Sequence, residues 1–96
     1  MSHCFAITGE FSIYRAAELA QALHEWLPQA VEHGYVALDL SEVTEMDSSG
    51  LQLLLSTQRS AQDLQLPFTL QAVSPAVTDV LQLAALEHLL PSAPEL

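Results

Sequence analysis

The chain has 96 residues, half of them apolar, with two basic and twelve acidic side chains and a formal net charge of −10. This length and composition predict one folded domain, residues 1–96, and argue against a largely disordered chain. Two basic residues are too few for binding nucleic acid through its phosphates, and no apolar run approaches the roughly 20 residues that cross a bilayer. The single cysteine, Cys4, can form no internal disulfide, which fits the reducing cytoplasm expected for this protein.

The first half of the chain is predicted to form a strand, a helix and a second strand. The first strand covers residues 3–8. A helix over about residues 14–31 follows, since apolar residues recur there every three or four positions; Pro28 is expected to end or kink it. The second strand covers residues 35–40 and begins with an unbroken apolar run, which indicates burial on both faces.

The second half is predicted to continue the alternation of helices and strands. A loop over residues 44–50 leads to a helix from Leu51 to about residue 62, and a third strand covers residues 68–73. Ser74 and Pro75 are of the types that begin a helix. Residues 86–90 are expected to form a last short edge strand, and residues 91–96 a flexible tail.

This order predicts an α/β fold with a mostly parallel or mixed sheet of about four strands, covered by three to four helices. Functional loops of such sheets gather at the carboxyl ends of the strands. The loops at residues 9–14 and 44–50 are therefore expected to be neighbours.

The segment Asp47-Ser48-Ser49-Gly50 stands at the start of a predicted helix. A helix N-terminus offers N–H groups without intrahelical partners and the positive end of the macrodipole. A serine there can cap the helix, or it can carry a phosphate that the helix end favours. From the residues alone, both interpretations stay open.

Residues 36–51, VALDLSEVTEMDSSGL, resemble the signature of STAS domains of the anti-sigma factor antagonist type. That signature is a hydrophobic strand ending in Asp or Asn, a spacer, and then Asp-Ser-Ser-Gly-Leu. Gly9-Glu10-Phe11 and residues 73–77 are further landmarks, so the resemblance covers nearly the whole chain. Residues 11–19 also resemble small STAS proteins associated with chemotaxis gene clusters. The chain departs from the antagonist pattern at Ser12, where Asp is usual.

The resemblance implies a binding switch rather than an enzyme, with no cofactor and no metal. In the family, a partner serine kinase that is also an anti-sigma factor phosphorylates the first serine of the motif, here Ser48. The unmodified antagonist binds that kinase, and a phosphatase resets the modified form. The partner-binding residues expected here are Asp47, Ser48, Ser49, Gly50, Gln52, Ser56, Arg59 and Ser12.

Other functions are also considered. A STAS subunit of a phospholipid-transporting ABC system, or of another signalling complex, would act without phosphorylation; such transporter subunits usually carry Thr in the motif region. A nucleotide-binding module is disfavoured because the chain has no Gly-rich phosphate loop. The four histidines have no short ligand spacing, and Ser48 lacks the Gly-x-Ser-x-Gly context of a hydrolase nucleophile.

Overall fold

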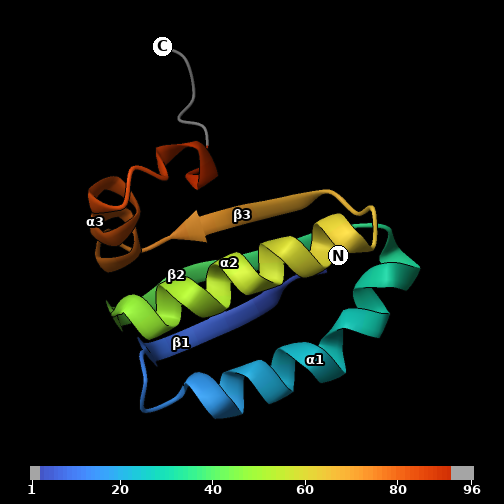
Figure 1. Ribbon diagram of the computed structural model, residues 1–96, viewed down its shortest axis with the longest axis horizontal. Coiled ribbons are helices and arrows are strands. Elements are labelled where there is room, and N and C mark those ends of the chain that lie inside the picture. The colour runs from blue at the N-terminus through green and yellow to red at the C-terminus, as the bar shows by residue number, and fades with distance from the viewer. Residues whose placement is uncertain (1–2, 92–96) are drawn as a thin grey trace.

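The computed structural model describes residues 3–91 and has a β-α-β-α-β-α order (Figure 1). The elements are β1 (Phe5–Phe11), α1 (Ala16–His33), β2 (Val36–Met46), α2 (Ser48–Asp63), β3 (Phe68–Val73), α3 (Pro75–Leu83) and the short 3-10 helix η1 (Glu87–Leu89). No helix of this described part combines the length and the apolar character needed to cross a membrane.

The three strands form a parallel sheet in the order β1-β2-β3, with Leu38 of β2 paired to Phe5 on one side and to Leu70 on the other. Figure 1 shows α2 in front of the sheet, α1 along the side of β1, and α3 beyond the end of β3. The predicted α/β class and parallel pairing are therefore confirmed. The sheet has three strands rather than about four.

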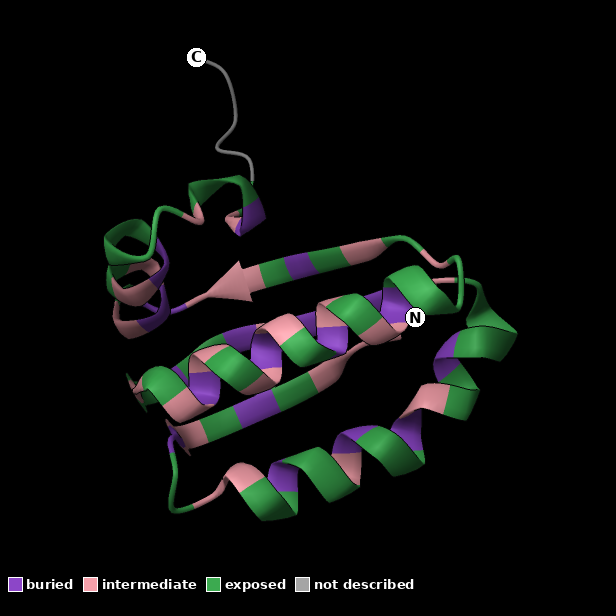
Figure 2. Ribbon diagram, in the orientation of Figure 1, coloured by how far each residue is buried: buried purple, intermediate pink, exposed green. Residues whose placement is uncertain are grey.

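The core lies between this helical layer and the sheet, where Figure 2 shows buried positions on the facing sides of α2 and the strands. Apolar side chains of β1, β2, α2 and α3 form its centre. The largest fully buried members are Phe11, Ile7, Leu38, Leu40, Leu54, Leu81, Val36 and Val77. Trp26 of α1 is also buried, at 8% exposure.

Strand β1 begins and ends later than predicted, and β2 is longer than predicted. The predicted loop at residues 44–50 is wrong at both ends, since β2 runs on to Met46 and α2 already begins at Ser48. Residues 44–46 continue β2, where Glu45 pairs with Glu10 and Met46 with Phe11. Sequence alternation missed this extension because four of the six residues after Leu40 are exposed and polar, and the register shifts twice along the β1–β2 pair. As a result, Asp47 alone links β2 to α2.

The predicted edge strand at residues 86–90 is also wrong, because the chain folds back onto α3 instead. Ala85 adopts a φ of 59°, and the N–H of Leu86 donates to the carbonyl oxygen of Leu81 at 2.8 Å. This reversal leads into η1, whose Leu89 is 9% exposed and packs into the core. Of the predicted flexible tail, only Pro91 belongs to the described residues.

Helix α1 does not end at Pro28 but continues to His33, and its axis bends in its second half (Figure 1). It ends at Gly34, whose φ of 85° is the left-handed conformation that favours glycine.

Candidate functional site

The carboxyl ends of β1 and β2 meet where α2 begins, and we call this region the switch corner (residues 11–14 and 46–50). Phe11 pairs with Met46, and the N–H of Asp47 donates to the carbonyl oxygen of Phe11 at 3.4 Å. The two loops predicted to be neighbours therefore do meet, with the start of α2 directly against the end of β1.

Asp47 holds the switch corner together through both carboxylate oxygens. Its Oδ1 accepts hydrogen bonds from the N–H groups of Ser49 and Gly50, at 2.9 and 3.0 Å, and so caps α2. Its Oδ2 accepts from the N–H of Ile13 at 3.1 Å. These bonds, first that from Ile13 and then that from Gly50, hold the pKa of Asp47 below its ordinary value of 3.8.

Gly50 is the point of closest approach between α2 and β1. A Cβ atom at this position would lie 2.1 Å from the carbonyl oxygen of Phe11 and 3.0 Å from its carbonyl carbon. No side chain fits there without moving the backbone, so the glycine of the motif is required by packing.

Ser48 is the first residue of α2 and is exposed, whereas Ser49 is half-buried. Neither serine caps the helix, because Asp47 does so. A phosphate on Ser48 would find the N–H groups of Ser49 and Gly50 already bound to Asp47, and it would stand beside a carboxylate of the same sign.

Further along α2, Gln52, Ser56 and Arg59 lie on the exposed side of the helix that begins at Ser48, as their three- and four-residue spacing requires. Together with Leu55 they line a hollow of about 350 Å³. Within the described residues, Arg59 is in no ion pair. Ser48, Gln52, Ser56 and Arg59 therefore form one exposed stripe, whereas Gly50, which was also expected to bind a partner, is buried against Phe11.

The family model described as "Mlab, STAS domain" matches residues 3–91. The chain belongs to the STAS domain family. A solved structure of the anti-sigma factor antagonist SpoIIAA in its unphosphorylated form is similar, with a TM-score of 0.69 and 20% sequence identity, over 99% of this chain and 85% of that one. At this identity the likeness shows a shared fold. No curated protein matches the chain significantly.

Ser12 does not lie on the surface of this STAS domain, although it was predicted to bind a partner. Its side chain is 5% exposed, and its Oγ accepts a hydrogen bond from the N–H of Tyr14 at 3.3 Å. The residue therefore shapes the loop, and its hydroxyl reaches a partner only if the loop opens.

The two residues after Ser12 are the most exposed apolar side chains of the switch corner; they lie in the loop at residues 9–14, of which only Ser12 was singled out from the sequence as a partner-binding residue. Ile13 is 65% exposed and Tyr14 is 86% exposed. Two large apolar residues directly after the Gly9-Glu10-Phe11 landmark are a signal that could have found them. The hydrogen bond from Ile13 to Asp47 places them beside the motif.

Arg15, the other basic residue, stabilises the end of β1. Its guanidinium donates to the carbonyl oxygens of Thr8 and Glu10 and lies 3.6 Å from the carboxylate of Glu18. These contacts occupy carbonyl groups of β1 where the strand bulges at Gly9, whose φ is 79°. The described residues contain no cluster of three or more His, Cys, Asp or Glu side chains that could hold a metal ion.

Proposed function

We propose that this STAS domain is a phosphorylation-regulated binding switch rather than a catalyst, acting in the cytoplasm on a serine kinase that is also an anti-sigma factor. The observation that carries the proposal is the position of Ser48. It is exposed at the first residue of α2, beside an Asp47 carboxylate whose hydrogen bonds are already made. Membership of the STAS family supports it.

The unmodified protein would bind through a docking patch formed by Ile13, Tyr14, Ser48 and the stripe of Gln52, Ser56 and Arg59. Exposed aromatic and arginine side chains often supply much of the binding energy of protein interfaces. Here Tyr14 and Arg59 would have that role, at opposite ends of the patch. The polar residues between them carry no charge and cost little to desolvate.

Phosphorylation would change both the charge and the shape of this docking patch. A phosphate adds about −1.5 to −2 charges at pH 7. Because Asp47 holds the N–H of Ile13, repulsion between the phosphate and Asp47 would also loosen the loop that presents Ile13 and Tyr14. The partner would then lose a neutral contact at Ser48 and an ordered apolar contact beside it, and a phosphatase would restore both.

The first experiment is phosphopeptide mapping after reaction with the cognate serine kinase. We expect phosphate on Ser48 in the wild type and in Ser49→Ala, and none in Ser48→Ala. Affinity for the unmodified protein should exceed that for the phosphorylated form and for Ser48→Asp. Phosphate only on Ser49, Thr44 or Ser56, or no phosphate at all, would refute the proposal.

A second candidate is a subunit that binds a transporter ATPase of a phospholipid-transport system without phosphorylation. The family description, "Mlab, STAS domain", does not specify a phosphorylated member. The protein isolated from its native cell decides between the two: this candidate requires an unmodified Ser48 and copurification with a transporter ATPase.

A further inference from the structure

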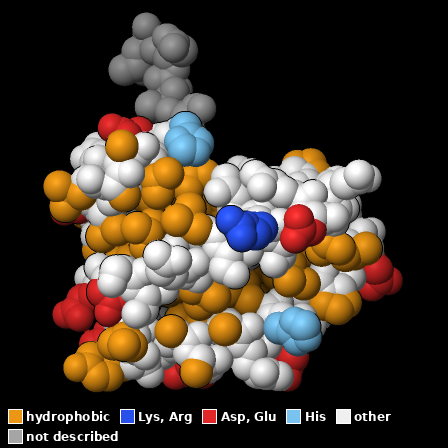
Figure 3. All heavy atoms as spheres, viewed as in Figure 1, with side chains coloured by type: hydrophobic (Ala, Val, Ile, Leu, Met, Phe, Trp, Pro, Cys, Tyr) orange, Lys and Arg blue, Asp and Glu red, His pale blue; other side chains and the backbone are white. Residues whose placement is uncertain are grey.

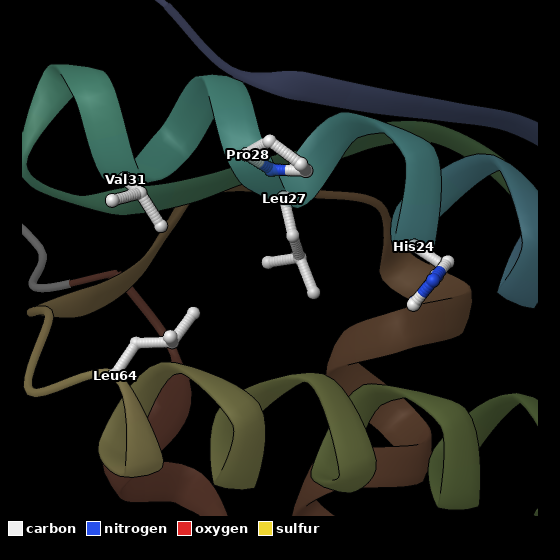
Figure 4. A pocket seen from close by; sticks show the side chains of 5 residues that line it. All are labelled: His24, Leu27, Pro28, Val31 and Leu64. Atoms are coloured by element: carbon white, nitrogen blue, oxygen red, sulfur yellow. The ribbon is translucent and has the colours of Figure 1, made fainter.

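An apolar groove lies between α1 and the end of α2, remote in sequence from the switch corner. It has a volume of about 410 Å³ and is lined by His24, Leu27, Pro28, Val31 and Leu64. Figure 4 shows Leu27 and Val31 of α1 facing Leu64 across the opening. Val31 and Leu64 remain 49% and 44% exposed. Apolar side chains on both walls therefore meet water where the two helices separate, and Figure 3 shows hydrophobic side chains at the surface between α1 and α2.

The groove is elongated. The lining residues of α1, from His24 to Val31, span two helical turns, about 10 Å along the axis. A smaller hollow of about 160 Å³ shares His24 and Leu27 with the groove and continues between α1 and α2 toward Ser56. An extended row of apolar side chains fits this shape better than a compact molecule does.

Two exposed acidic residues stand next in sequence to residues that line the groove. Glu32 follows Val31 on one wall, Asp63 precedes Leu64 on the other, and both are exposed. Neither of the two basic residues of the chain lines the groove. With a net charge of −10, a second copy of this chain would be repelled, whereas a basic partner would be attracted.

The wall of α1 also offers a hydrogen-bond acceptor. Pro28 has no N–H, so the carbonyl oxygen of His24, one turn earlier, lacks the hydrogen bond that a regular α-helix would give it. Both residues line the groove. This oxygen is therefore a candidate acceptor for a lysine or arginine side chain of a bound helix.

We propose that this groove binds an amphipathic helix of a partner protein, with apolar residues along one side and lysine or arginine beside them. Such helices bind in grooves through apolar residues spaced three and four positions apart. The groove would be a second interface, used together with the switch corner or separately from it. It does not depend on Ser48.

The test uses two synthetic 18-residue helical peptides with leucine at every third and fourth position, one with lysine and one with glutamate elsewhere. Binding to the full chain is measured by calorimetry and mapped by amide chemical shifts. We expect the lysine peptide to bind and shift Leu27, Val31 and Leu64, with at least about tenfold weaker binding of the glutamate peptide.

Paired variants separate the apolar and charged contributions. Val31→Gln with Leu64→Gln should weaken the lysine peptide about tenfold, because both exposed apolar contacts are lost. Leu83→Gln is the matched control, since Leu83 is apolar and 89% exposed on α3, and it should leave affinity unchanged. Glu32→Gln with Asp63→Asn should reduce affinity about threefold and flatten its salt dependence. Circular dichroism checks that each variant is folded.

Several results would overturn the proposal. These are no binding of the lysine peptide, equal binding of the glutamate peptide, equal losses in Leu83→Gln, or shifts confined to Ile13 and Tyr14. Dimerisation of the wild type that Val31→Gln with Leu64→Gln abolishes would assign the groove to a second copy instead. Ser48→Asp should bind the lysine peptide like the wild type, so the outcome is separate from that of the phosphorylation switch.

Discussion

The two ends of α2 are built in opposite ways. At its start, the switch corner is closed by four hydrogen bonds around Asp47 and by a glycine that touches the backbone of β1. At its end, Leu64 faces Val31 across an open apolar groove, and nothing in the described structure fills the space between them. One helix therefore carries a site fixed by directional hydrogen bonds at its start and an exposed apolar surface at its end.

Their sensitivity to substitution should differ accordingly. The energies of hydrogen bonds and close backbone contacts depend steeply on geometry, so small changes at the switch corner should destabilise the fold. Exposed apolar side chains contribute mainly through the area that they bury on binding, so changes in the groove should leave the fold intact.

The largest effect on stability should come from Gly50→Ala. Alanine normally favours a helix over glycine, but here its methyl group would collide with the carbonyl oxygen of Phe11. We expect a loss of about 1–3 kcal/mol in the free energy of unfolding, measured by urea denaturation. Ser49→Ala, one residue earlier in the same turn, should stay within about 0.5 kcal/mol. Equal changes in both variants would mean that α2 can move away from β1.

The next effect should come from Asp47, where two substitutions separate its roles. Asp47→Ala removes the helix cap and the bond to Ile13, and it should lower the melting temperature by several degrees. Asp47→Asn keeps one oxygen for the cap but replaces the acceptor for Ile13 with a donor, so its melting temperature should fall less. An asparagine variant as unstable as the alanine variant would show that the bond to Ile13 is the more important one.

The pH dependence of Asp47 follows from its lowered pKa. Because the folded-state pKa lies below the unfolded value of 3.8, this carboxylate stabilises the fold fully at neutral pH. The contribution is lost as pH falls below about 4, through the folded pKa. The stability difference between wild type and Asp47→Ala should therefore shrink on acidification, as thermal melts from pH 7 to pH 2 would show. A constant difference would contradict the carboxylate role.

Ser48→Asp should change stability by less, within about 1 kcal/mol, because Ser48 is exposed and the favourable helix dipole offsets part of the repulsion from Asp47. Its local effect should be larger than its global one. Repulsion of Asp47 should increase hydrogen exchange at the amide of Ile13, measured by nuclear magnetic resonance, while Ser48→Ala should not. Unchanged protection of the Ile13 amide would mean that a negative charge at Ser48 does not loosen the loop.

The smallest change in stability, within about 0.5 kcal/mol, is expected from Tyr14→Ala, since the ring is 86% exposed. Binding to the kinase partner should nevertheless weaken about tenfold or more, as for an aromatic residue that contributes strongly to an interface. Leu83→Ala serves as the control of equal exposure on α3. Unchanged affinity in Tyr14→Ala would remove the loop from the docking patch.

The helices and strands that depend on interactions between neighbouring residues could be predicted from the sequence. The positions of α2, β3 and α3 follow from apolar spacing and from residues that begin helices, such as Ser74 and Pro75. The motif singled out Asp47 and Gly50 as partner-binding residues, whereas the structure shows that one caps α2 and the other allows α2 to pack against β1. The sequence could not predict that Ser12 would be buried while Ile13 and Tyr14 are exposed, because a loop has no periodic pattern that assigns sides.

The α/β class, the order of elements and the motif at the start of α2 can be read from the chain, because propensity, periodicity and capping act over a few neighbouring residues. The three-dimensional packing was needed to show that Oδ2 of Asp47 accepts from Ile13, 34 residues away, and that Gly50 abuts Phe11. It also decided that residues 86–90 fold back on α3 and that Val31 and Leu64 face each other. These contacts join distant segments, and their geometry depends on how helices and strands pack.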